Sequence, residues 1–348
     1  MTAPRTTSQP ALRENTDPLA RLSIAVGMCV LLLTACSDGE QSTSGPRQDS
    51  KPTKATAPAE PSIPPRITGG PELDFDLIPA NRTTVGTGQP IALEFAQPVR
   101  NKAAVEKALT VKTSDNTEGA WGWVTTPVGH DRLDWRPKNP WKPGTTIQIK
   151  GDLTTVDPGS AHFTRTLDRS FTIGRDQRLL ADLDTHTLTV TLDGTTVKTI
   201  PISGGEPVPG RASRPGTFAI KSQEHKVRMT SASVNGPKDY DKDVYWAMRF
   251  SDSGGYLHAA PWADENGDLG QRNGSAGCIG MSDTNATWLF KNSLLGDLFT
   301  IKGEEATAEL GGPGNGYADW SLTWEQWQQK SALTRPETPS TERAMPRG

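Results

Sequence analysis

The sequence of 348 residues has little excess charge, few hydrophobic residues and no long apolar run. Its formal net charge is −3 at neutral pH, without large runs of one sign. This balance argues against a nucleic-acid-binding protein, which would carry a basic excess. Hydrophobic residues make up 34%, whereas there are 28 prolines and 34 glycines. This composition indicates strands and loops with disordered ends. The apolar stretch at 22–33 is too short for an ordinary transmembrane helix but fits a signal-peptide core.

Cysteine is also scarce, with only Cys29, Cys36 and Cys278 in the chain. The apolar stretch ends in Leu-Thr-Ala-Cys at 33–36, which resembles the bacterial lipobox. The resemblance implies that residues 1–35 are a lipoprotein signal peptide and that a lipid on Cys36 anchors the protein to the outer face of the cell membrane. An uncleaved apolar anchor is the alternative. Both hypotheses place the rest of the chain outside the cytoplasm.

The remaining sequence predicts a mainly β protein built from successive segments. Residues 36–66 are rich in Ser, Thr, Pro and Lys and cannot bury enough apolar surface to fold, so we expect a disordered tether. Alternating apolar residues with regular turn signals predict an immunoglobulin-like sandwich over 67–175. A second β-rich unit is expected over 176–302. An extension at 303–333 would pack on this unit, and 334–348 would be a disordered tail.

Within the first β unit, a short helix is expected near 102–109, where the apolar residues do not alternate. Trp135 and Trp141 are interpreted as core or interface anchors. In the extension, Trp320, Trp324 and Trp327 are spaced for one stripe of a helix packed on the domain.

The second β unit carries several local signals. Two alternating segments around Asp193-Gly194 predict a hairpin, because Asp-Gly suits a tight primed turn. Residues 222–243 are interpreted as a long polar loop, with His225 and Met229 in it. Ser282 is a plausible N-cap for a helix that follows.

The candidate chemistry depends on Cys278 and His258. Processing at Cys36 would remove Cys29 with the signal peptide and lipidate Cys36, so Cys278 would be the only free thiol. Such a cysteine is either a small buried hydrophobe or a reactive group. A thiol becomes a strong nucleophile when a nearby imidazole takes its proton. A strand ending in His258 and a helix opening at Cys278 could bring the two together, and a helix N-terminus would favour the thiolate. Spacing alone makes this pair a weak signal.

The surrounding residues add a specific resemblance. In the L,D-transpeptidases with a YkuD-type catalytic domain, a histidine is followed after a short gap by Ser/Thr-His-Gly-Cys. Here His258 is followed, after residues 259–274, by Ser-Ala-Gly-Cys at 275–278. His-x-Ala-Pro-Trp at 258–262 and Ser-x-x-Asn-Ala-x-Trp at 282–288 are similar to the family as well.

The resemblance extends over about residues 67–330. Trp-Arg-Pro at 135–137 and Trp-Lys-Pro-Gly-Thr at 141–145 resemble the immunoglobulin-like domain of mycobacterial-type members, and 319–327 resembles their C-terminal extension. The resemblance implies an acyltransferase acting on peptidoglycan stem peptides. Cys278 would attack the third residue of a tetrapeptide, release D-alanine, and pass the acyl group from a thioester to the amine of a second stem. The product would be a 3→3 cross-link in the cell wall.

The resemblance also implies individual roles. His258 would act as general base and then as general acid. The backbone N–H groups of Gly277 and Cys278, with the slim Ala276 beside them, would support an oxyanion. The carbonyl of Ala259 would orient the imidazole. The loop at 222–243 would be a flap over the substrate. Substrate contacts are expected from four residues: Met229, Tyr256, Ser275 and Trp262.

Several positions depart from the family pattern. Ala276 replaces a second histidine, Gly280 replaces Asn or Arg, Ala259 stands where serine is common, and Asp252 replaces a tyrosine. A weakened relative that binds peptidoglycan as a wall scaffold is therefore an alternative to an active enzyme. Hydrolysis, with water as the acceptor, is a third hypothesis.

No metal or cofactor is expected. A zinc site fails on ligand count, because His258 and Cys278 lack two further ligands at suitable spacing. The resemblance implies instead that β-lactams of the carbapenem type acylate Cys278. The expected partners are thus stem peptides, such inhibitors and the membrane through the lipid, with no nucleic acid.

Overall fold

The computed structural model describes residues 64–159, 161–234, 241–309 and 311–334. Cys36, the predicted signal peptide and most of the tether and tail lie outside the described residues. Within the described ranges, no helix is both long and apolar enough to cross a membrane.

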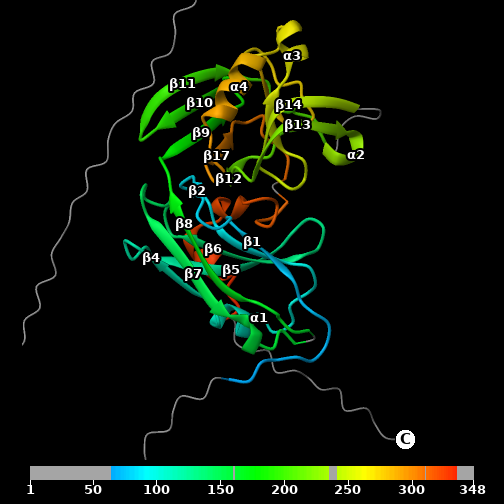
Figure 1. Ribbon diagram of the computed structural model, residues 1–348. Helices are drawn as coiled ribbons and strands as arrows, with labels where there is room; N and C mark the ends of the chain where they lie inside the picture. Colours follow the sequence, from blue (N-terminus) through cyan, green and yellow to red (C-terminus); the bar gives the residue numbers. More distant parts are fainter. Residues whose placement is uncertain (1–63, 160, 235–240, 310, 335–348) are drawn as a thin grey trace, which may run out of the picture. The chain divides into compact units, whose positions relative to one another are not determined.

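The first domain is the expected β-sandwich of two four-stranded sheets (Figure 1). One sheet contains, in spatial order, β1 (Phe75–Ile78), β3 (Ile91–Phe95), β6 (Asp131–Pro137) and β5 (Gly119–Thr125). The other contains β2 (Thr84–Val85), β8 (Thr166–Ile173), β7 (Thr146–Asp152) and β4 (Thr110–Thr113). Alternate side chains of both sheets form one buried core.

Two short helices complete this domain. Helix α1 (Lys102–Lys107) starts at the N-cap Asn101, whose side chain accepts a hydrogen bond from the Ala104 N–H, and η1 (Leu153–Thr155) is a 3₁₀ turn. The predicted helix near 102–109 is therefore confirmed, although it is shorter. The indoles of Trp135 and Trp141 stack with centroids 5.2 Å apart and are buried, so both are core anchors.

The second domain contains a five-stranded and a four-stranded sheet. The five-stranded sheet has the order β11 (Thr195–Pro201), β10 (Thr187–Leu192), β9 (Gln177–Asp182), β17 (Leu298–Lys302) and β12 (Gly216–Ala219). The four-stranded sheet has the order β13 (Ser222–Thr230), β14 (Asp241–Arg249), β15 (Tyr256–Ala259) and β16 (Ile279–Met281). The helices of the rest of the described chain are α2 (Ser231–Val234), α3 (Pro261–Glu265), α4 (Asp283–Lys291), η2 (Ala318–Ser321) and α5 (Trp324–Gln328).

Local signals determine two of these elements. Asp193 and Gly194 have φ of +48° and +80°, which is the primed turn that the Asp-Gly pair predicts between β10 and β11. The side chain of Ser282 accepts a hydrogen bond from the Asn285 N–H and caps α4, as expected.

The interpretation of 222–243 as a long polar loop is wrong. Most of this segment forms the paired strands β13 and β14, joined through α2 and residues outside the described part. Charged side chains pair across the hairpin, with Lys226 Nζ 2.8 Å from Asp243 and Arg228 bonded to Asp241. The polarity that suggested a loop is therefore the exposed face of a two-stranded ribbon, since cross-strand charge pairs stabilise such a ribbon.

The extension does not pack on the catalytic domain alone, and its three tryptophans do not share one helix. Trp320 lies in η2, whereas Trp324 and Trp327 lie in α5. All three rings surround the buried guanidinium of Arg136 on β6, at 4.9, 5.5 and 5.3 Å. The indole of Trp327 also donates to the carbonyl of Ala120 on β5 at 2.9 Å. Cation–π contacts with Arg136 thus stabilise the packing of the extension on the first domain.

The extension also covers the edge of the first sheet. Strand β5 is an edge strand, and its Trp123 N–H donates to the Lys330 carbonyl at 3.0 Å. The buried carboxylate of Glu106 accepts hydrogen bonds from the Trp123 indole, the Ser331 hydroxyl and the Ala332 N–H. The last described residues therefore satisfy polar groups of the first domain.

A buried ionic network joins the two domains and the extension. Arg132 on β6 pairs with Asp134 at 2.7 Å and donates to the Gly316 carbonyl at 2.7 Å. The Nη1 atom of Arg132 lies 3.8 Å from the carboxylate of Asp252 in the second domain. The ammonium of Lys221 also contacts this carboxylate, at 2.7 Å. Asp252 thus takes part in a link between domains.

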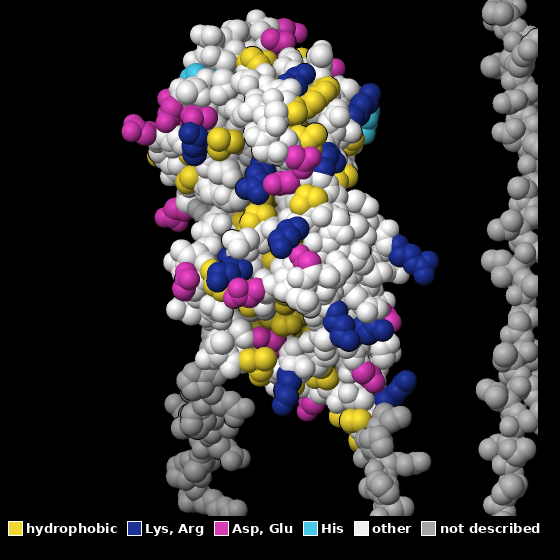
Figure 2. All heavy atoms as spheres, turned by 90° about the vertical axis from the view of Figure 1, so that its left-hand side faces the viewer, with side chains coloured by type: hydrophobic (Ala, Val, Ile, Leu, Met, Phe, Trp, Pro, Cys, Tyr) yellow, Lys and Arg dark blue, Asp and Glu magenta, His cyan; other side chains and the backbone are white. Residues whose placement is uncertain are grey.

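The surface carries charges of both signs. On the face drawn in Figure 2, lysine and arginine side chains alternate with aspartate and glutamate, and hydrophobic side chains are scattered among them. No continuous patch of one sign is visible on that face.

Candidate active site

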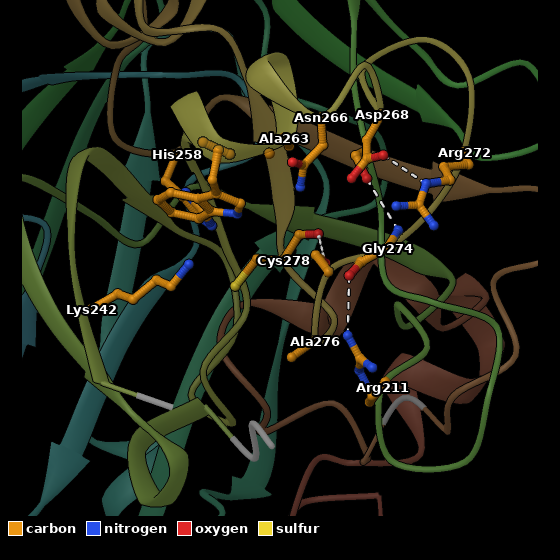
Figure 3. A pocket seen from close by; sticks show the side chains of 15 residues that line it. Arg211, Lys242, His258, Ala263, Asn266, Asp268, Arg272, Gly274, Ala276 and Cys278 are labelled. Carbon is orange, nitrogen blue, oxygen red and sulfur yellow. Dashed lines mark hydrogen bonds and ion pairs between the residues drawn. The ribbon is translucent and has the colours of Figure 1, made fainter. Parts of the chain in front are cut away.

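Sheet pairing brings the two candidate residues together. Strands β15 and β16 are parallel neighbours, with His258 opposite Gly280 and Leu257 opposite Ile279. Cys278 directly precedes β16, so it lies on the neighbouring strand, two residues before the position opposite His258. Both residues line a pocket of about 280 Å³, and both are buried, with exposures of 3% and 6% (Figure 3).

The ring of His258 is held in one orientation by its neighbour. Its Nδ1 lies 2.7 Å from the Ala259 carbonyl, which can only accept, so Nδ1 carries the proton and donates. The other nitrogen, Nε2, is therefore left as a base. Burial lowers the pKa of His258 below its ordinary value, so the imidazole is neutral near pH 7.

Cys278 rests as a protonated thiol. Its Sγ lies 3.6 Å from the Gly254 carbonyl, to which the S–H donates. Burial raises the pKa of the Cys278 thiol to about 11, and a hydrogen bond from the Tyr256 backbone N–H opposes this shift. A neutral thiol beside a neutral base is suited to proton transfer during attack, rather than to a preformed ion pair.

The expectation that Cys278 opens a helix is wrong. Residues 279–281 form β16, and α4 begins only at Asp283. Parallel pairing with β15 places this segment in the sheet, because Ile279 and Met281 are fully buried against it. A helix N-terminus therefore does not stabilise the thiolate.

A tight turn presents the thiol to the pocket. The Ser275 hydroxyl donates to the Cys278 carbonyl at 2.7 Å and accepts from the Gly277 N–H at 3.1 Å. Gly277 has φ of +112°, a region that side chains disfavour, so glycine is required there. Because its N–H is engaged, an oxyanion role for Gly277 remains a prediction that needs this hydrogen bond to open. Ala276 adds only a methyl group to the pocket lining.

The predicted substrate contacts divide into two groups. Trp262 and Ser275 line the pocket, and the Trp262 ring lies 5.9 Å from that of His258. Met229 and Tyr256 do not line it: they are 1% and 6% exposed and pack with Cys278 in a small apolar cluster. This cluster is buried, so Cys278 lies at the border between an apolar core and the pocket.

Sequence reasoning missed several polar residues of the pocket wall. Their side chains come from two separate connections, 202–215 and 266–278, and from the hairpin, so no local motif links them all. Asp268 and Arg272 pair at 2.6 Å with i,i+4 spacing, which is the only local signal that the sequence offered for this wall. The missed lining residues are Ser203, Arg211, Lys242, Asn266 and Arg272.

Among the described residues, no cluster of three or more His, Cys, Asp or Glu side chains could hold a metal ion. The pocket instead offers a thiol, a base and hydrogen-bonding groups. That set is typical of nucleophilic acyl transfer.

Comparisons with known proteins agree with this class of site. Residues 68–157 match a bacterial Ig domain, and residues 176–301 match the L,D-transpeptidase catalytic domain. The chain is 33% identical to L,D-transpeptidase 2 of Mycobacterium tuberculosis over 264 residues, which are 74% of this chain and 62% of the relative. It is 31% identical to L,D-transpeptidase 1 of the same species over 229 residues, which are 65% of this chain and 83% of the relative.

Solved structures give the same result. An LD transpeptidase in complex with imipenem is 30% identical with a TM-score of 0.56, covering 67% of this chain and 99% of that chain. L,D-transpeptidase 3 of M. tuberculosis in complex with a faropenem-derived adduct is 27% identical with a TM-score of 0.53, covering 65% and 97%. The chain therefore belongs to the L,D-transpeptidase family. It spans 62% and 56% of the length of two curated relatives that it matches.

Proposed function

We propose that this protein is a cysteine acyltransferase that forms 3→3 cross-links between peptidoglycan stem peptides. One observation carries the proposal: the Cys278 thiol and the neutral His258 imidazole, with Nε2 unprotonated, line one buried pocket. Family membership supports the reaction class. The two relatives solved with imipenem and a faropenem-derived adduct support β-lactams as inhibitors.

The reaction follows from these two groups. His258 Nε2 takes the thiol proton while Sγ attacks the carbonyl carbon of the third stem residue. The tetrahedral intermediate collapses, the bond to the D-alanine nitrogen breaks, and the imidazolium returns the proton to that nitrogen. The resulting thioester is attacked by the side-chain amine of a second stem. The amine proton passes to His258 and then to the departing sulfur, which restores the thiol.

The cellular location belongs to the same proposal. The substrate lies outside the cytoplasmic membrane, and a lipid on Cys36 would hold the domains there. Cys36 is outside the described residues, so its sequence motif alone supports this anchor.

Intact-mass measurement with imipenem tests the nucleophile. The full-length chain should gain one adduct, and the Cys278→Ser variant should gain none under the same conditions. Analysis of products from tetrapeptide muropeptides then separates cross-linking from hydrolysis, since only cross-linking yields a 3→3 dimer.

A peptidoglycan-binding scaffold is the second candidate. The absence of a second imidazole at Ala276 and the raised pKa of the Cys278 thiol favour it over a fast enzyme. A chain that binds muropeptides but forms neither an imipenem adduct nor a dimer would support the scaffold and contradict the enzyme.

A further inference from the structure

Of the basic side chains that line the pocket, Lys242 is the one that no carboxylate of the described residues pairs with. Three basic side chains line it, namely Arg211, Lys242 and Arg272. Arg272 pairs with Asp268 at 2.6 Å, and Arg211 pairs with Glu206. The two arginines are therefore neutralised by the protein.

Lys242 differs because its neighbouring carboxylates are already engaged. Asp241 is bound to Arg228, and Asp243 is bound to both Lys226 and Arg228. Among the residues that the structure describes, no acidic side chain lies within ion-pair distance of the Lys242 ammonium.

The position of this ammonium is defined by an aromatic ring. Lys242 Nζ lies 4.2 Å from the centroid of the Trp262 ring, which itself lies 5.9 Å from the His258 ring. Figure 3 shows the Lys242 side chain extending from the hairpin toward the space between His258 and Cys278. A cation held over an indole keeps its hydrogen-bond donors free for a ligand.

We infer that Lys242 binds the free C-terminal carboxylate of the leaving residue and selects donor peptides that carry it. The inference rests on the proposed function, because only an acyl transfer at Cys278 produces a leaving residue. The part of the pocket next to the thiol would hold that residue. The carboxylate carbon is two bonds from the scissile amide nitrogen, so it lies close to Cys278 when Sγ meets the carbonyl carbon. An unmatched ammonium is the natural partner of this anion, and a charge-assisted hydrogen bond discriminates against a neutral amide.

The test compares two tetrapeptide donors, one with a free C-terminal carboxylate and one with a C-terminal carboxamide. The full-length chain should use the acid with the higher kcat/KM. Lys242→Met should lower kcat/KM for the acid about 10- to 100-fold, the range expected from a hydrogen bond to a charged group. It should leave the amide nearly unchanged, and Lys242→Arg should keep the preference for the acid.

A matched control exists on the opposite sheet. Lys198 also places its ammonium over an indole, 4.6 Å from the Trp288 ring, but does not line the pocket. Lys198→Met should leave both kcat/KM values unchanged.

The outcomes separate the two proposals. If Lys242→Met lowers both donors equally, or neither, the assignment of the carboxylate to Lys242 is overturned while the proposed function stands. If the wild-type chain forms no acyl-enzyme with any donor, the proposed function fails and the inference fails with it.

Discussion

Single residues set the protonation states on which catalysis depends. The Ala259 carbonyl fixes the tautomer of His258, and burial keeps both the imidazole and the Cys278 thiol neutral. Met229 and Tyr256 belong to the same buried apolar cluster as the cysteine and do not line the pocket. We therefore expect these two side chains to affect the reaction through the environment of the sulfur rather than through the pocket wall.

The pH dependence of acylation follows from these states. Below the pKa of His258, which lies under 6.5, the imidazole cannot take the thiol proton, so the imipenem acylation rate should fall as pH falls. Above neutrality the rate should level off and then rise again toward pH 11, as thiolate forms. His258→Gln should abolish the acidic limb and slow acylation about 10²- to 10⁴-fold at neutral pH. Stopped-flow measurement from about pH 5 to about pH 10 covers both ranges.

A pH profile of acylation with the opposite trend would contradict this prediction. A wild-type rate that falls above neutral pH would mean that the reactive form is a thiolate–imidazolium pair, which contradicts the neutral resting state described above.

At the scale of elements, the turn at 275–278 determines where the thiol points. Ser275 makes two hydrogen bonds within it, and Gly277 supplies the left-handed backbone. Because the turn leads directly into β16, the parallel pairing with β15 fixes its far end. The position of the Cys278 thiol thus depends on the hydroxyl group of Ser275.

Ser275→Ala tests this dependence. Removing two hydrogen bonds worth about 0.5–1.5 kcal/mol each should lower the free energy of unfolding by about 1–3 kcal/mol. It should also slow imipenem acylation, since the turn would no longer hold Cys278 in place. Ser275→Thr keeps the hydroxyl and should restore most of both quantities. Urea titration and intact-mass kinetics measure them; an unchanged acylation rate in the alanine variant would exclude a positioning role.

The sequence predicted those elements whose signals are local. Asp193-Gly194 determines its own turn, and Ser282 caps its own helix. Cys278 was placed on a helix instead, because the pairing of β15 with β16 is a contact between distant segments. Lys242 was missed for a similar reason: residues 222–243 were interpreted as a loop, whereas their pairing places Lys242 on β14 beside the pocket. The pair His258 and Cys278 was found because both residues belong to a motif that resembles the family's, and both line one pocket.

At the scale of the whole molecule, buried charge connects the two domains. Arg132 is 1% exposed, and its guanidinium forms ion pairs with both Asp134 and Asp252. The pKa of Arg132 is raised despite burial, because the Coulomb attraction of Asp134 and Asp319 outweighs desolvation. The Arg132 guanidinium therefore stays charged at all ordinary pH values, and its loss would leave buried acidic side chains without this partner.

Arg132→Met should destabilise the protein strongly. Leaving a buried carboxylate unpaired costs about 3–5 kcal/mol, so the urea midpoint followed by tryptophan fluorescence should fall by a corresponding amount. Lys150→Met removes a cation that pairs with Asp168 in an exposed ion pair, and it should change the free energy of unfolding by less than about 1 kcal/mol. Equal effects of the two substitutions would contradict a structural role for the buried network.

The return of residues 330–332 to the first domain has a consequence for biosynthesis. A ribosome makes the chain from its N-terminus, so strand β5 and the Glu106 carboxylate emerge long before the Lys330 carbonyl and the Ala332 N–H that complete their hydrogen bonds. Until residues 330–332 are made, the sandwich has an open edge strand and a carboxylate without its final partners. These residues therefore cover the edge of the domain that is made first, and a nascent chain that stops at β17 would keep this edge available for pairing with other strands.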